Sequence, residues 1–338
     1  MKGLFRFALI FITLAQVLCG CGQKGGNAGK APVQVIFDTD IGNDIDDAIA
    51  LSMLFNYDKA GVIDLNAITI CKRNPHCVEY IDGVSRFFGR GDIPVGFAYD
   101  GTMPEDYTYL LPTINAEYEG RPLLDIRRTL DGSIPAGYKM LRQQLGAAAD
   151  TSVVLITVGP LTNIANLLTS APDELSDLGG IGLVRQKVKL VSIMGGDFIS
   201  EWAEYNIICD IPAAQKVFSL CPSPLVAGGY EVGSAVHYPH TSILNDFGDP
   251  DSNPICVGYM NYCPMPYDRE CWDPLATLEA IEPGVDGILS RSEKGRITIS
   301  DSGVSYFTPD PSGLQQYVIL NDADKAVEML VRRASGKE

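Results

Sequence analysis

Short apolar runs alternate with stretches of helical periodicity along most of the chain. The runs are rich in β-branched residues and short enough to be buried strands, and the stretches between them repeat apolar residues at the spacing of one helix face. This alternation predicts βαβ units and a mainly parallel sheet. The predicted strands end at residue 37 and cover 62–71, 93–95, 153–158, 188–194 and 225–227, and the predicted helices cover 46–57, 77–88, 135–146, 161–168, 213–220, 274–281 and 322–333.

Two segments break this alternation. Residues 98–133 are rich in Pro, Gly, Tyr and Asp and have weak periodicity, which predicts loop structure around a site. Residues 295–320 predict a segment of antiparallel β-strands, because β-branched and aromatic residues gather there. The chain has no internal repeat, and we expect one α/β domain over residues 33–338.

The N-terminal end of the chain has the pattern of a bacterial lipoprotein signal. Residues 1–20 combine a basic start with an apolar run that is short for a membrane span, and residues 21–32 form a flexible, Gly-rich linker. Leu-Cys-Gly-Cys at 18–21 resembles the lipobox, which implies cleavage before Cys21 and a lipid anchor on it. We therefore expect a location in the bacterial cell envelope, on the periplasmic or outer-membrane side. A plain secretory signal and a membrane helix are the alternatives.

Composition limits the partners of the predicted domain. The chain has 338 residues, 46% of them hydrophobic and 20% charged, which is typical of globular proteins. Its net charge of −16 argues against nucleic acid as a partner, because phosphate binding favours a basic surface. Of nine cysteines, Cys19 and Cys21 belong to the signal and the anchor, which leaves seven. We predict no disulfide, and composition does not decide whether a homo-oligomer forms.

Aspartates gather behind the first predicted strand. They occupy positions 38, 40, 44, 46 and 47, and the last two stand where a helix starts. In an open α/β sheet, ligands bind beyond the carboxyl end of such a strand. Carboxylates this close repel one another, and a hard divalent cation such as Ca²⁺ or Mg²⁺ relieves that repulsion best. The alternative is a solvated acidic loop with a helix cap, and an EF-hand is excluded because its closing Glu would be Ile49.

Three later stretches also lie at the ends of predicted elements. Gly-Pro-Leu-Thr-Asn at 159–163 joins a strand to a helix, and its corner turns backbone carbonyls outward, where they suit Ca²⁺. Met-Gly-Gly-Asp at 194–197 precedes Glu204 and Asn206, whose side chains suit a polyol. Trp272 and Asp273 start a late helix. Each stretch alone is explained more simply as a turn or a helix cap.

Taken together and in this order, the motifs resemble a known enzyme family. Asp-Thr-Asp…Asp-Asp-Ala, Gly-Pro-Leu-Thr-Asn, Met-Gly-Gly, Glu-Tyr-Asn and Trp-Asp-Pro are similar to those of the inosine-uridine-preferring nucleoside hydrolases. The resemblance covers residues 33–320 and implies a Rossmann-like α/β fold with a mostly parallel central sheet and flanking helices. It also implies a Ca²⁺ cofactor and hydrolysis of the N-glycosidic bond of ribonucleosides to ribose and free base.

The resemblance implies roles for residues at matched positions. Asp40 would be both a metal ligand and the general base that activates water, and the carbonyl of Val158 would be a further ligand. Glu204 and Asn206 of the Glu-Xaa-Asn motif would hold the sugar together with Asp46 and Asn74. Trp272 would shape the base pocket or stack on the base. The residues implied are Asp40, Asp47, Val158 and Asp273 for the metal and Asp46, Asn74, Glu204, Asn206 and Trp272 for the substrate.

Three features, at four positions, depart from the family pattern. Asn43 and Asp44 form an insertion in the acidic motif, and Phe198 stands where an Asn is common. Trp272 replaces a histidine that helps to protonate the leaving base. We expect slow cleavage of natural purine nucleosides unless another acid substitutes, and the segment 231–240, with its histidines, is where such an acid would be sought.

Two rival functions compete with this interpretation. Asp38 and Asp40 resemble the Asp-Xaa-Asp of haloacid-dehalogenase-type phosphatases, with Asp38 as nucleophile, but Asp46, Asp47 and the segment 159–163 would then have no role. The other rival is a lipoprotein that binds calcium and a sugar without catalysis, which Trp272 favours.

Overall fold

The computed structural model describes residues 31–101 and 109–337. The predicted signal peptide, the anchor at Cys21 and the linker up to residue 30 lie outside the described residues, as does the segment 102–108 of the predicted loop. Within the described ranges, no helix is long and apolar enough to cross a membrane.

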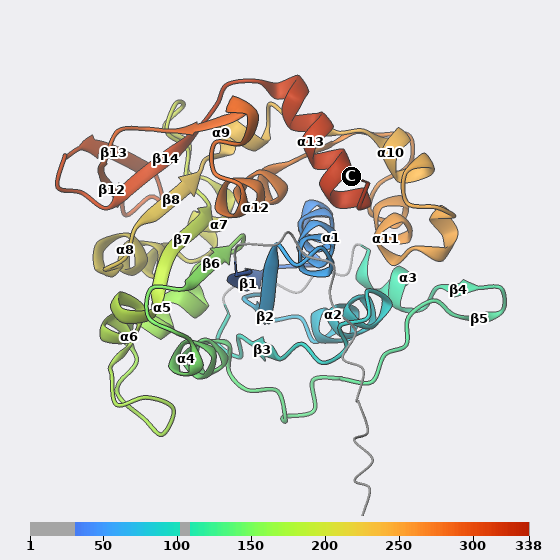
Figure 1. The fold of residues 1–338 in the computed structure, drawn as a ribbon, viewed down its shortest axis with the longest axis horizontal. Coiled ribbons are helices and arrows are strands. Elements are labelled where there is room, and N and C mark those ends of the chain that lie inside the picture. The colour runs from blue at the N-terminus through green and yellow to red at the C-terminus, as the bar shows by residue number, and fades with distance from the viewer. Residues whose placement is uncertain (1–30, 102–108, 338) are drawn as a thin grey trace, which may run out of the picture.

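A ten-stranded sheet forms the centre of the described structure (Figure 1). Its order is β13-β12-β14-β8-β7-β6-β1-β2-β3, with β11 paired to β14. All neighbours from β14 through β8 to β3 are parallel, and β11, β12 and β13 pair antiparallel at one end. The strands are β1 Val33–Thr39, β2 Ile63–Ile70, β3 Val95–Phe97, β6 Val153–Thr157, β7 Val188–Met194, β8 Leu225–Gly228, β11 Leu289–Arg291, β12 Gly295–Ile299, β13 Ser305–Pro309 and β14 Gln315–Leu320.

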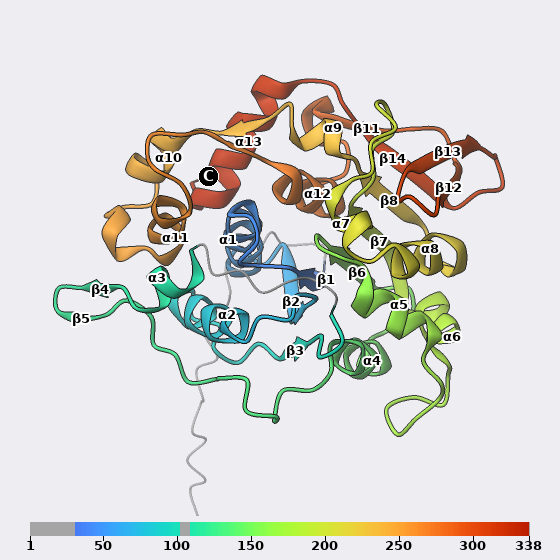
Figure 2. The same ribbon diagram turned by 180° about the vertical axis from the view of Figure 1, so that it is seen from behind.

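Helices cover both faces of the sheet, so the parallel strands are buried on both sides, as this architecture requires (Figures 1 and 2). Strand β1 shows the division, because Val35 and Phe37 pack into one hydrophobic core and Ile36 packs into the other. The first core takes α1 Asp46–Lys59, α2 His76–Phe87, α11 Pro254–Tyr262, α12 Trp272–Ile281 and α13 Ala323–Ser335, and the second takes α4 Gly137–Ala147, α5 Thr162–Thr169, α6 Gly180–Lys187 and α8 Ile211–Leu220.

The predicted α/β class and the mostly parallel central sheet are confirmed. The pattern missed α6 and α11, which are short. The predicted antiparallel segment is present, because β12 pairs antiparallel with β13 and β14, but β14 also pairs parallel with β8. The described part of 98–133 contains a short helix and a hairpin as well as loops. Small elements outside the sheet are α3 Leu110–Ile114, α7 Tyr205–Cys209, α9 Tyr230–Gly233, α10 His240–Asn245, the hairpin β4 Glu117–Tyr118 with β5 Arg121–Pro122, and the ribbon β9 His237–Tyr238 with β10 Arg269–Glu270.

The strand order reverses direction at β1. Strands β2 and β3 follow on one side of β1, whereas β6, β7 and β8 follow on the other. Such a switch point opens a crevice at the carboxyl ends of the strands, because the connections leave in opposite directions. Asp40, Val158 and Tyr230 stand just beyond the ends of β1, β6 and β8, and Met194 ends β7.

Candidate active site

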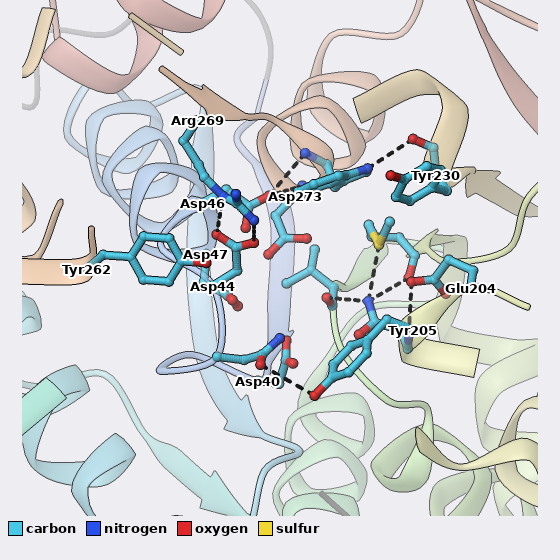
Figure 3. A pocket seen from close by; sticks show the side chains of 15 residues that line it. Asp40, Asp44, Asp46, Asp47, Glu204, Tyr205, Tyr230, Tyr262, Arg269 and Asp273 are labelled. Carbon is cyan, nitrogen blue, oxygen red and sulfur yellow. Dashed lines mark hydrogen bonds and ion pairs between the residues drawn. The ribbon is translucent and has the colours of Figure 1, made fainter. Parts of the chain in front are cut away.

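The carboxyl ends of these strands border a pocket with a volume of about 340 Å³ (Figure 3). Its described lining joins segments that are far apart in the chain: the β1–α1 loop, α7, α9, the end of α11 and the start of α12. The lining residues are Asp40, Asn43, Asp44, Asp46, Asp47, Val158, Met194, Glu204, Tyr205, Asn206, Tyr230, Tyr262, Arg269, Trp272 and Asp273.

Four buried aspartates form what we term the floor of the pocket: Asp40, Asp46, Asp47 and Asp273. Asp46 and Asp47 are in the first turn of α1, and Asp273 is in the first turn of α12. Helix N-termini favour negative charge, so both helices stabilise carboxylates here. One oxygen each of Asp46, Asp47 and Asp273 lies within 4.8 Å of the others, which is close enough to hold one metal ion.

Asp40 lies beside this group, close to the loop that follows β6. A Cβ on Gly159 would come within 2.7 Å of the Asp40 Cβ, so only glycine lets that loop approach so closely. Asp40 is 3% exposed, and its Oδ2 has no hydrogen-bond partner among the described residues. The backbone oxygen of the neighbouring Val158 accepts from Asn206 Nδ2 at 2.9 Å.

The floor suits a bound cation. Burial raises the pKa of Asp40 to about 7, with Lys72 acting in the opposite direction. Burial, and then repulsion between neighbouring carboxylates, raises the pKa of Asp47 and Asp273 well above the usual range. Asp47 Oδ1 accepts from Thr39 Oγ1, but Asp47 Oδ2 has no partner in the described structure. Buried carboxylate oxygens without donors have the chemistry of ligands for a hard divalent cation.

Asp46 lies beside two of the predicted metal ligands. The predicted metal set was Asp40, Asp47, Asp273 and Val158, with Asp46 at the sugar, and the structure brings an oxygen of Asp46 close to Asp47 and Asp273 as well. Asp46 Oδ2 also accepts from the backbone N of Trp272 and of Asp273, each at 3.0 Å. It therefore links the start of α1 to the start of α12.

Glu204 and Asn206 lie on the opposite side of the pocket. Glu204 is the N-cap of α7 and accepts from the backbone N of Asn206 at 2.9 Å and of Ile207 at 3.2 Å. Burial raises the pKa of its carboxyl to about 7. The capping role that the sequence offered as an alternative is present, and both side chains also line the pocket.

Asn74 is a predicted substrate contact that the structure does not bring to the pocket lining. It is fully buried after β2, and its Oδ1 accepts from His76 N at 3.0 Å. Asp38, the nucleophile of the phosphatase alternative, is also outside the lining. Its oxygens accept from Thr69, Thr157 and Asn163, so it supports the sheet and is not exposed to a substrate.

Planar side chains in contact with one another form what we term the wall of the pocket: Tyr230, Tyr262, Arg269 and Trp272. Tyr230 stacks on Trp272 with centroids 5.7 Å apart, and Trp272 Nε1 donates to the Tyr230 carbonyl at 2.9 Å. The Arg269 guanidinium lies 5.3 Å from the ring centroids of both Tyr262 and Trp272. Trp272, which the resemblance offers for contact with the base, lines the pocket, and so does Tyr205.

Sequence reasoning missed Arg269, Tyr230 and Tyr262. No local motif marks them, because a single Tyr at the end of a short helix or a single Arg in a short strand is ordinary composition. The inserted residues were noticed, but their contacts were not: Asp44 pairs with Arg269, and Asn43 Oδ1 accepts from Tyr205 OH at 3.4 Å.

The expected substitute acid is absent from the described lining of the pocket. His237 lies 4.0 Å from Glu270 on the β9–β10 ribbon, and His240 Nδ1 lies 2.6 Å from Asp268. The expectation that residues 98–133 surround the site is also wrong for their described part, none of which lines the pocket. Tyr109 does not line the pocket but supports the acidic loop, because its hydroxyl accepts a hydrogen bond from Gly42 N at 3.0 Å.

A cation-suited carboxylate cluster at the switch point of a parallel sheet defines a class of α/β enzyme. Within that class, residues 35–308 match the sequence profile of the family described as inosine-uridine preferring nucleoside hydrolase, and the chain belongs to this family. It is therefore an enzyme that hydrolyses the N-glycosidic bond of nucleosides.

Individual relatives agree with this assignment. The chain is 28% identical over 231 residues to the pyrimidine-specific ribonucleoside hydrolase RihA of Citrobacter koseri. The aligned region covers 64% of this chain and 67% of the relative. A plant nucleoside hydrolase, PpNRh1, superposes with a TM-score of 0.67 at 20% identity, over 90% of this chain and 99% of that one. The nucleoside hydrolase of Bacillus anthracis superposes with a TM-score of 0.67 at 16% identity, over the same shares. The two structures share the fold.

Proposed function

We propose that the protein is a calcium-dependent ribonucleoside hydrolase that releases ribose and free base, with water activated by Asp40. The observation that carries the proposal is the floor, where Asp40 and Asp47 each keep a buried oxygen without a donor in the described structure. Burying such oxygens is costly unless a cation or a substrate group satisfies them.

The cation would be held by Asp40, Asp47, Asp273 and the carbonyl of Val158, with Asp46 in reach of the same position. The donors are all oxygen atoms, which favours calcium or magnesium over softer metals. Calcium suits a mixed set of carboxylates and a carbonyl better than magnesium, which demands a near-octahedral shell. When bound, the cation supplies charge that lowers the pKa of a nearby water.

The chain's own residues then supply the remaining chemistry. Asp40 Oδ2 accepts the proton of the attacking water, and the ionised form needed for this is favoured when a cation compensates its burial. The water adds to the anomeric carbon as the bond to the base breaks, through an oxocarbenium-like transition state as in glycosidases. Glu204, Asn206 and Asp46 would hold the sugar hydroxyls, so that binding energy positions the ring for attack.

The base would lie against the wall. Trp272 and Tyr230 offer stacked ring faces, and an indole cannot protonate a leaving group. A substrate with a leaving group that needs no proton should therefore react faster than natural nucleosides. The pyrimidine specificity named for RihA supports placing uridine and cytidine beside inosine and adenosine in a substrate panel.

The test is turnover of this panel and of 4-nitrophenyl riboside by the purified protein. We expect release of ribose from at least one nucleoside, faster release from the nitrophenyl riboside, loss of both activities after chelation, and recovery with Ca²⁺. Turnover that survives thorough chelation would contradict the metal dependence. Calcium binding without turnover of any substrate would favour the rival in which only binding remains.

We also propose that the protein is anchored in the bacterial cell envelope through lipidated Cys21. The lipobox-like segment 18–21 and the Gly-rich linker support this proposal. One acyl chain binds membranes only marginally, so stable attachment needs several. Cys21→Ser should lose the lipid and leave the membrane fraction. A variant that is cleaved and still sediments wholly with membranes would disprove the anchor.

A further inference from the structure

The wall contains a cation that the proposed reaction has not yet used. No histidine is among the described lining residues, so no imidazolium faces a departing base. Arg269 is the one lysine or arginine in that lining, and every other ionisable side chain there is a carboxylic acid or a tyrosine. Arg269 is therefore the strongest electrostatic partner in the described pocket for negative charge that develops on a leaving group.

The structure holds Arg269 in a fixed orientation. Its guanidinium carbon lies over the rings of both Tyr262 and Trp272, at 5.3 Å from each ring centroid. Asp44 grips one edge, because Nε donates to Asp44 Oδ1 at 2.8 Å and Nη2 donates to Asp44 Oδ2. Nη1 lies 3.0 Å from Glu270 Oε2. A guanidinium has two N–H bonds on each terminal nitrogen, so Nη1 and Nη2 each retain one beyond these contacts.

We propose that Arg269 stabilises the departing base and that the inserted Asp44 positions it for this role. This inference rests on the proposed nucleoside hydrolysis and adds the missing partner of the leaving group. A planar, hydrogen-bonding cation beside the stacking face of Trp272 suits a heterocyclic base, which has in-plane oxygen and nitrogen acceptors. Asp44, which has no counterpart in the shorter acidic motif, thereby gains a function.

The step balances without a general acid. The bond from C1′ to the base nitrogen breaks, and its electron pair passes to the base. Water adds to C1′ and gives its proton to Asp40. The base leaves as an anion that accepts charge-assisted hydrogen bonds from Arg269, then takes a proton from solvent, while Asp40 returns its proton to solvent. Arg269 remains protonated throughout, because its guanidinium does not act as a proton donor at neutral pH.

The experiment compares two leaving groups in one variant. Nitrophenolate is stable as an anion and needs little help, whereas the anion of uracil needs stabilisation. We expect Arg269→Gln to lower the ratio of kcat/KM for uridine to kcat/KM for 4-nitrophenyl riboside by about 10²-fold, the loss typical of one preorganised donor. Arg269→Lys should recover part of the ratio, since it keeps the charge but lacks the planar fork.

Two further variants separate leaving-group chemistry from structural support. Asp44→Asn keeps the Arg269 guanidinium but weakens the contact that orients it. The ratio of kcat/KM for uridine to kcat/KM for 4-nitrophenyl riboside should therefore fall by less than in Arg269→Gln. Arg296→Gln is the matched control, because Arg296 pairs with Asp310 at 2.7 Å and does not line the pocket. Its ratio should equal that of the wild type.

Several outcomes would overturn the inference. An Arg269→Gln variant that loses the same factor on both substrates would show that Arg269 only supports the acidic loop. An unchanged ratio would show that it does not act on the base. If Arg269→Gln fails to fold, as judged by its thermal transition, the comparison passes to Arg269→Lys, whose ratio must still fall. Wild-type protein that cleaves neither substrate would instead refute the proposed function itself.

Discussion

The floor and the wall of the pocket satisfy their polar atoms in opposite ways. In the floor, Asp40 and Asp47 are almost wholly buried, and each has an oxygen without a donor among the described residues. In the wall, Trp272 Nε1 donates to a backbone carbonyl, and Arg269 is paired with Asp44. The floor thus has buried oxygens that the described chain leaves without a donor, whereas these two polar groups of the wall are paired within the chain.

Asp38 shows that burial alone does not explain this difference. It lies in β1 two residues before Asp40 and is fully buried, and burial raises its pKa to about 6. Its oxygens nevertheless accept hydrogen bonds from Thr69, Thr157 and Asn163. A buried acid with a full set of donors supports the fold, and a buried acid with a bare oxygen marks a site for a ligand.

The largest effect should follow from removing Asp40, the proposed general base in the floor. Asp40→Asn should reduce kcat/KM by about 10²–10⁴-fold for both uridine and 4-nitrophenyl riboside, because the water must be activated whatever the leaving group. Steady-state kinetics on the two substrates measures this. If the variant kept its activity on the nitrophenyl riboside alone, Asp40 would act on the departing nucleobase and not on the water.

The next effect concerns the cation. Asp47→Asn should raise the dissociation constant for Ca²⁺ at least about tenfold, or 1.4 kcal/mol, and abolish turnover, because a ligand charge is lost from the floor. Isothermal calorimetry on the wild type and the variant checks it. Equal affinities would refute Asp47 as a ligand, and Trp272→Phe in the wall serves as the control that should bind Ca²⁺ normally.

The pH dependence of stability should also separate two buried acids of the pocket, Asp40 in the floor and Glu204 opposite it, from the wall. Burial raises the pKa of Asp40 and of Glu204 to about 7, above the unfolded values, so their protonated forms stabilise the metal-free fold at low pH. That stability is lost as the pH rises through about 7. The free energy of unfolding after chelation should therefore fall from pH 5 to pH 8 by at least about 1.4 kcal/mol, the value of one pKa unit.

Denaturant unfolding at the two pH values measures this change. Added Ca²⁺ should stabilise the protein more at pH 8 than at pH 5, because binding requires ionised carboxylates. A chelated protein that is more stable at pH 8 would show that the floor acids are already ionised without a cation. Trp272→Phe should leave the change in the free energy of unfolding between pH 5 and pH 8 unaltered.

The smallest effect should come from the stacked face of the wall. Trp272→Ala should raise KM for nucleosides by about 2- to 10-fold, since aromatic contacts contribute about 0.5–1.5 kcal/mol, and Trp272→Phe should change it less. Kinetics on uridine and inosine checks this, with the larger effect on the larger base. A fall in kcat that matches Asp40→Asn would contradict a purely binding role for the wall.

The sequence predicted the floor better than the wall. The floor acids belong to short motifs that follow strands or start helices, so their position at the carboxyl edge follows from local pattern. Tyr262 and Arg269 of the wall belong to no such motif, and only tertiary packing brings Tyr262 beside Arg269 and Arg269 to Asp44. For the same reason the sequence could not place Asn74 outside the lining or group Asp46 with Asp47 and Asp273.

By itself, the sequence determined the α/β class, the mostly parallel sheet and the family, because hydrophobic periodicity and ordered motifs are properties of neighbouring residues. Only the tertiary structure decided which side chains meet. It brought Arg269 to Asp44 across the pocket, kept His237 and His240 out of the described lining, and left a bare oxygen on Asp47 while Asp38 gained three donors. Contacts between distant segments depend on how strands and helices pack, and no local pattern in the chain records that packing.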